Sequence, residues 1–325
     1  MKIINKYIVL LLLLSSTVFA QLGGYAGSFT RMGFGARGIS MGNAMTSVTY
    51  GDINGYYNPA LSPFQNEHLV TLSYSFLSLD RSLNFVSYTK NFKLPNNPEG
   101  GAGFTFSWIN AGVSNIDGRD ADGFQIGNFS VFENQFTFAP AVRVSEKVSF
   151  GIGFKFYYSK LFDGVTSTSL GFDVGGLYKV NDKINVGLAV KDLNSKYSWN
   201  TASVYGQENG SITTDRFPVL YNLGVSYLLP KELGVVSLEY ETSNQKENVL
   251  KAGGEINFMK EFSFRAGVDR FDLSAKDIFG NSKIMFGVGF QKPLGKTTLG
   301  INYSFELEPY SHNPFQTLTA VFKIL

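Results

Sequence analysis

Side chains that could act as nucleophiles or metal ligands are scarce in this chain. It has no cysteine and only two histidines, His68 and His312. Catalysis by a Ser–His pair requires a histidine oriented beside a serine, and neither histidine stands in a recognisable arrangement of that kind. The absence of cysteine excludes disulfides, thiol nucleophiles and cysteine-based metal sites. The sequence therefore predicts a protein that is not an enzyme and that holds no metal ion or cofactor.

Two short motifs have a superficial likeness to binding loops. Residues 117–123 read DGRDADG, but the acidic spacing is wrong for an EF-hand and no glutamate closes the loop. We interpret this segment as an extracellular turn. The glycines Gly33 and Gly35 precede no βα unit, so the sequence does not support a nucleotide site.

The elements that must position any site are short segments in which apolar residues alternate strictly with small or polar residues. In residues 148–158 one face carries Phe150, Ile152 and Phe154, whereas the other face carries Gly151 and Gly153. A period of two residues predicts a strand. The pattern recurs in fourteen segments, namely 69–76, 83–90, 102–109, 134–143, 148–158, 169–179, 184–193, 219–228, 235–241, 249–258, 262–270, 284–291, 298–305 and 317–325.

Such strands, apolar on one face and small or charged on the other, are typical of a membrane barrel. The chain is 44% hydrophobic and 17% charged, and a transmembrane barrel has lipid outside and a polar lumen inside. We predict an all-β fold, a transmembrane antiparallel β-barrel of about fourteen strands over residues 65–325. The alternative is a large secreted β-sandwich or propeller. The longer connections, 111–129, 197–217, 272–283 and 306–315, are assigned to the outside, which puts both ends of the barrel in the periplasm.

The N-terminus reads as an export signal over residues 1–20. Lys2 and Lys6 precede an apolar run over residues 7–14, and small residues end the signal at Ala20. We therefore expect the protein in the outer membrane of a Gram-negative-type bacterium. Without those two lysines the formal charge of +2 disappears, and a neutral chain argues against nucleic acid as a partner.

The predicted inward face is small and of mixed charge. Its charged members are Lys155, Asp173, Lys191, Glu239, Lys251, Glu255, Arg265 and Asp269. One interpretation is a permeation path or ligand route. We favour the other, an interior paired with itself and packed against a plug, because mixed signs suit pairing better than ion selectivity. Residues 21–64 lack the alternation and are rich in glycine and apolar residues, so we predict that they form this plug.

The predicted plug also carries a motif that resembles the N-terminal signature of the PorV/PorQ family, whose members have the fold of the FadL fatty-acid transporter. The matching positions are Ala36, Arg37, Met41, Gly42, Asp52, Asn58, Pro59 and Ala60. Weaker likeness continues through residues 122–123, 127–130, 151–158, 173–175 and 191–194. The resemblance implies a fourteen-stranded barrel whose N-terminal segment fills the lumen.

Three functions follow from these observations. The first, implied by the resemblance, is a component of type IX secretion that binds or shuttles exported proteins, with secretion-system proteins as further partners. The second is a FadL-like transporter that passes a hydrophobic small molecule through a plugged lumen and out through a lateral gap. The third is a purely structural barrel. In each, outer-membrane lipid surrounds the protein. The small apolar lining of the predicted lumen ranks secretion first.

Overall fold

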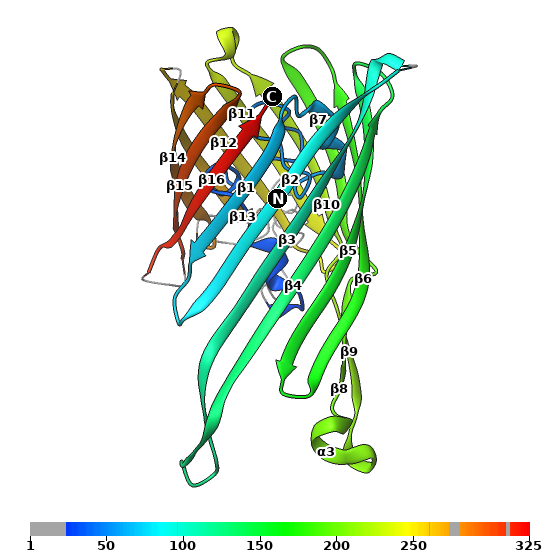
Figure 1. Cartoon of the computed structure of the whole chain (residues 1–325), viewed down its shortest axis with the longest axis vertical. Coiled ribbons are helices and arrows are strands. Elements are labelled where there is room, and N and C mark those ends of the chain that lie inside the picture. The colour runs from blue at the N-terminus through cyan, green and yellow to red at the C-terminus, as the bar shows by residue number, and fades with distance from the viewer. Residues whose placement is uncertain (1–23, 96, 260, 273–279, 310–312) are drawn as a thin grey trace, which may run out of the picture.

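The computed structural model describes residues 24–325, except for 96, 260, 273–279 and 310–312. Within these residues fourteen strands form a closed antiparallel barrel (Figure 1), which confirms the predicted fold class. The predicted signal, residues 1–20, lies outside the described part. The barrel strands are β1 (His68–Phe76), β2 (Arg81–Leu94), β3 (Asn97–Arg119), β4 (Gln125–Arg143), β5 (Val148–Phe162), β6 (Val165–Lys179), β7 (Ile184–Leu193), β10 (Leu220–Leu228), β11 (Gly234–Ser243), β12 (Asn248–Phe258), β13 (Phe262–Asp272), β14 (Lys283–Leu294), β15 (Thr297–Leu307) and β16 (Phe315–Ile324).

Strand β5 shows how the alternation builds the wall. Phe150 and Phe154 point outward, with 58% and 48% of their surface exposed, whereas Lys155 and Tyr157 point inward with 3% and 0% exposed. In water such outward phenylalanines would be costly, but in a bilayer they face hydrocarbon. The outer surface of the whole barrel repeats this pattern, so the wall is built to contact lipid.

The barrel closes where its first and last strands meet. Strand β1 pairs with β16 from His68 opposite Ile324 to Phe76 opposite Gln316. On the inner face, the hydroxyl groups of Ser73 and Thr319 lie 2.8 Å apart across this seam. Closure leaves no strand edge of the ring unpaired, which is the condition for a sheet to lie in hydrocarbon. No helix in the described parts of the chain is long and apolar enough to cross a membrane.

The two ends of the barrel differ. Turns at one end are short, and the C-terminus lies there, whereas a long β3–β4 hairpin projects from the other end (Figure 1). We call them the short-turn end and the long-loop end. Connection 111–129, predicted as a loop, is mostly an extension of β3 and β4. Connection 197–217 is not a plain loop either, because it holds β8 (Lys196–Asn200), helix α3 (Ala202–Asn209) and β9 (Ile212–Arg216). A short 3₁₀ turn, η4 (Pro230–Glu232), joins β10 to β11.

The segment before β1 lies inside the barrel (Figure 1). We call residues 24–64 the plug. It contains three short helical elements, η2 (Ser28–Arg31), α2 (Ala36–Ser40) and η3 (Pro59–Phe64). Asn58 starts η3, because its side-chain oxygen accepts a 2.9 Å hydrogen bond from the backbone N–H of Ala60 and Pro59 fits the first helical position. Plug and inner wall share one aromatic core, in which the ring of Phe34 stacks on Phe85 of β2.

Candidate functional site

The plug fits the wall through inward-facing glycines. Gly187 of β7 lies against the backbone of Thr46, and Gly253 of β12 lies against the backbone of Met41. A Cβ at either position would overlap these plug backbone atoms, so only glycine lets the plug backbone approach the strand this closely. The other inward glycines that meet the plug backbone are Gly103, Gly151, Gly175, Gly224 and Gly267. The lumen at this level is therefore filled by main chain against main chain.

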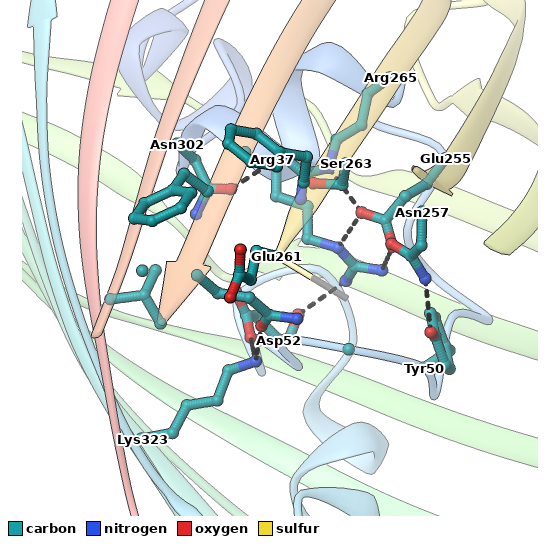
Figure 2. A pocket seen from close by; sticks show the side chains of 17 residues that line it. Arg37, Tyr50, Asp52, Glu255, Asn257, Glu261, Ser263, Arg265, Asn302 and Lys323 are labelled. Atoms are coloured by element: carbon teal, nitrogen blue, oxygen red, sulfur yellow. Dashed lines mark hydrogen bonds and ion pairs between the residues drawn. The ribbon is translucent and has the colours of Figure 1, made fainter. Parts of the chain in front are cut away.

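A charged latch ties the plug to one side of the wall (Figure 2). The Arg37 guanidinium donates to both carboxylate oxygens of Glu255 at 2.7 and 3.0 Å, and Arg265 donates to the same carboxylate at 2.5 Å. Asp52 pairs with Lys323 of β16 at 2.6 Å. Burial alone would lower the pKa of Arg37, but Glu255 more than offsets this and raises that pKa. The latch therefore stays ionised and holds two points of the plug.

The remaining predicted plug residues also contact the wall. The backbone N–H of Ala36 donates to the hydroxyl of Thr319 at 2.8 Å. Gly42 has a φ of +63° and lies against the backbone of Val268. The side-chain amide of Asn58 donates to the backbone of Gly176 at 3.1 Å. Each element of the motif thus occupies a position where the plug meets the barrel.

The first inward charge cluster is centred on Lys155 of β5. Its ammonium lies 2.8 Å from carboxylate oxygens of both Asp173 and Asp192. The hydroxyl of Tyr157 donates to Asp192 at 2.8 Å. Asp192 was not among the predicted inward charges, and it points inward next to Lys191 because the β6–β7 register shifts there. A bulge of this kind turns a neighbouring side chain to the same face.

The second inward cluster lies on β11 and β12. Lys251 pairs with Glu241 at 2.7 Å and lies 3.8 Å from Glu239, and Glu239 accepts a 3.0 Å hydrogen bond from the backbone N–H of Thr46.

Two further inward charges, on β7 and β13, contact the plug. Lys191 lies over the ring of plug residue Tyr56, 4.2 Å from its centre. Asp269 accepts a 2.9 Å hydrogen bond from the amide of plug residue Asn43. All eight predicted inward charges are buried, and they pair with each other or with the plug.

An apolar cavity of about 350 Å³ lies between the plug and the wall at the long-loop end. We call it the chamber. Sequence analysis did not identify it, because its walls come from distant segments. Its apolar lining includes Phe29 and Met32 of the plug, Ala111 of β3, Phe132 of β4 and Trp199 of β8. Arg81, Glu133 and Lys160 also border it. The one signal in the sequence was the alternation of Tyr197 and Trp199 within a stretch read as a loop.

A wider cavity of about 520 Å³ adjoins the chamber. We call it the mouth. It shares Ser28, Met32, Leu77 and Arg81 with the chamber and continues past Phe315. The shared lining joins the two cavities at the long-loop end, so the chamber is reached from that side of the plug.

The residues weighed for chemistry lie apart from these cavities. The ring nitrogen Nδ1 of His68, the first residue of β1, lies 2.8 Å from the hydroxyl of Tyr88. His312 lies outside the described residues. The turn at residues 120–123 is an exposed hairpin tip in which Asp120 accepts hydrogen bonds from the backbone N–H groups of Asp122 and Phe124. Among the described residues no group of three His, Cys, Asp or Glu side chains is arranged to hold a metal ion.

Comparison with known proteins gives structural matches alone. No protein-family model matches the chain, and no curated protein matches it. CymD, described as a monoaromatic hydrocarbon channel, is 13% identical, with 90% of this chain and 97% of CymD covered at a TM-score of 0.61. The toluene transporter TodX of Pseudomonas putida is 12% identical, with 90% and 97% covered and a TM-score of 0.57. A FadL homologue of Pseudomonas aeruginosa is 11% identical, with 88% and 97% covered and a TM-score of 0.56.

These matches bear on the predicted fold. Two of the matched proteins are described as a hydrocarbon channel and a toluene transporter. They do not single out the PorV/PorQ family, so that part of the resemblance stays a prediction. Identities near 12% establish the fold alone. The chain has the fold of the FadL-like transmembrane barrels.

Proposed function

We propose that this protein is an outer-membrane barrel that takes up a hydrophobic small molecule at its long-loop end. The observation that carries the proposal is the chamber, a mostly apolar cavity of about 350 Å³ between plug and wall. Ligand sites for small molecules are typically apolar cavities of about this size with a few polar groups at the edge. The structural likeness to hydrocarbon channels supports the same class of ligand.

The proposal includes an orientation. In outer-membrane barrels the periplasmic turns are short and the extracellular loops are long. We therefore place the long-loop end outside the cell and the C-terminus in the periplasm. Protease added to whole cells should cut the β3–β4 hairpin near Phe124, which is 72% exposed. Cleavage there only after the outer membrane is opened would reverse the orientation.

Binding of toluene to the purified protein tests the function. Ala111→Phe places a ring in the chamber and should weaken toluene binding about tenfold, or about 1.4 kcal/mol. Ala121→Phe is the matched control, because Ala121 is exposed at the tip of the β3–β4 hairpin. Equal toluene affinity in the wild type and Ala111→Phe would contradict a chamber site.

Secretion is separated from transport by deletion of the gene. Loss of hydrocarbon uptake with unchanged secreted proteins supports the proposal. Loss of secreted proteins with normal uptake would replace it by the type IX secretion role, which rests on the N-terminal motif.

A further inference from the structure

A second cavity, of about 180 Å³, lies at the short-turn end of the barrel (Figure 2). We call it the basal cavity. It opens between the plug loop at residues 50–52 and the inner faces of β12 to β16. It is distinct from the chamber, with which it shares no lining residue. Its lining is polar and includes Ser263, Arg265, Gly289, Asn302 and Lys323.

The centre of the basal cavity is a row of three residues on neighbouring strands. Ser263 of β13 pairs with Gly289 of β14, and Gly289 pairs with Asn302 of β15. A Cβ at position 289 would run into Ser263 Oγ, Asn302 Oδ1 and Arg265 Nη1. Three polar side chains therefore converge over a glycine and occupy the room that a side chain at position 289 would need.

The groups around this space are mainly hydrogen-bond donors. Arg265 uses Nε on Glu255 at 2.5 Å and Nη1 on Asn302 Oδ1 at 2.8 Å. Its other terminal nitrogen, Nη2, has no hydrogen-bond partner among the described residues, and neither do the Asn302 side-chain nitrogen and the Ser263 hydroxyl. Arg265 is itself 8% exposed. Nη2 borders the cavity, where water can reach it, and an oxyanion in place of that water would accept a charge-assisted hydrogen bond.

The ionised groups of the lining balance in number, three cations and three carboxylates, but they are unevenly placed. Two guanidinium groups, those of Arg37 and Arg265, share the single carboxylate of Glu255, so positive charge is in excess at this point of the lining. Lys323 and Asp52 pair one to one. One further carboxylate, that of Glu261, also borders the cavity and is exposed. The Glu261 carboxylate repels an anion in the cavity only weakly, because water at the cavity edge screens its charge.

We propose that the basal cavity binds a small oxyanion, a carboxylate or phosphate group, over Gly289. Arg265 Nη2, the Asn302 amide and the Ser263 hydroxyl donate to it, and Lys323 adds charge. This site does not rest on the proposed transport function. Because Arg265 also holds Glu255 of the latch, an anion bound to the seated plug stabilises that state by mass action.

Calorimetry on the full-length protein in detergent and a chloride buffer tests the site. Acetate, inorganic phosphate and sulfate are titrated separately, and the wild type should bind at least one with a Kd of about 1 mM or tighter. Acetate alone would identify a carboxylate site, whereas phosphate and sulfate alone would identify a site for tetrahedral anions. Absence of binding by all three would overturn the proposal.

The variants locate the site. Asn302→Asp keeps an oxygen for Arg265 but replaces the donor by a negative charge, so anion affinity should fall at least about tenfold. Asn248→Asp makes the same charge change at the start of β12, at the end of that strand away from the basal cavity, and should leave anion affinity unchanged. Ser263→Ala, which creates no clash, should weaken binding severalfold, and Glu261→Gln should strengthen it. Wild-type affinity in both Asn302→Asp and Ser263→Ala would show that the anion binds elsewhere.

Discussion

Arg37 of the plug and Glu255 of β12 form a bidentate ion pair, at 2.7 and 3.0 Å, across 218 residues of sequence. Both side chains are buried, and Arg265 shares the same carboxylate. A pair of this geometry ties a chain segment with few backbone hydrogen bonds to a rigid sheet. Seating of the plug is thus an electrostatic property of the lumen as well as a matter of shape.

Arg37→Met should release the plug from this side of the wall. Loss of one partner of a buried pair costs about 3 kcal/mol, although Arg265 still neutralises Glu255. We expect this variant to conduct ions across planar bilayers and the wild type, with its plug seated, not to. Arg119→Met is the control, because Arg119 pairs with Asp117 at the exposed hairpin tip. A closed Arg37→Met channel would show that the glycine contacts alone seat the plug.

Acid should loosen the plug near Asp52. Burial by itself would raise the pKa of Asp52, but Lys323 and Arg37 outweigh burial and lower that pKa. A carboxyl whose pKa is lower in the folded state stabilises it above the unfolded pKa, about 3.9, and this stabilisation is lost as pH falls through the folded value. A spin label at Thr49→Cys should therefore gain mobility below about pH 4.

The acid response is assigned to Asp52 by a second variant. In Asp52→Asn the label should be mobile already at neutral pH and should show a smaller acid step. An identical pH profile in both proteins would assign the loosening to another lumen carboxylate. The chain has no native cysteine, so the label marks one site.

Two adjacent glycines of β12 separate plug packing from strand stability. A Cβ at Gly253 overlaps the backbone of Met41, whereas a Cβ at Gly254 meets only Val236 Cγ1, at 3.7 Å. Gly253→Val should destabilise the seated plug by about 1–3 kcal/mol through overpacking, seen as faster proteolysis of the plug. Gly254→Val, on the lipid face, should leave the plug protected. Equal protection in both variants would mean that the plug does not contact β12 this closely.

The two tryptophans should respond differently to a hydrocarbon. Trp199 lines the chamber and is 9% exposed, while Trp108 lies on the outer side of β3 and donates to Asn134 at 3.1 Å. Trp199→Leu removes an aromatic wall and should weaken toluene binding by about 1 kcal/mol. Trp108→Leu should not. An affinity loss confined to Trp108→Leu would place the ligand on the outside of the barrel.

The wall was predictable from the sequence because each strand repeats a local pattern. Phe150 and Lys155 already reveal the two faces of β5. Each of the fourteen predicted segments matches one barrel strand, and only 219–228 and 317–325 extend past their strand, by one residue each. The β8–β9 ribbon was not found, because five-residue strands with only Tyr197 and Trp199 as a buried pair give too little periodicity. The extension of β3 and β4 beyond the wall was also missed, since polar residues there interrupt the alternation.

The pairing inside the lumen was not predictable. The charges were expected to face inward, but nothing local connects Arg37 with Glu255, or Asp52 with Lys323. These contacts depend on the register of strands that meet only when the ring is complete. The chamber depends on the same long-range arrangement, because plug, β3, β4 and β8 each supply a part of it.

The glycine contacts have a consequence for the order of assembly. Main chain of the plug rests against main chain of strands from β3 to β13, so the finished ring has little free width through which a plug could enter later. The plug precedes β1, and the ring is completed only when β16, the last strand, meets β1. Insertion into the membrane should then proceed around a segment already in place, and the plug would serve as the template on which the last seam is sealed.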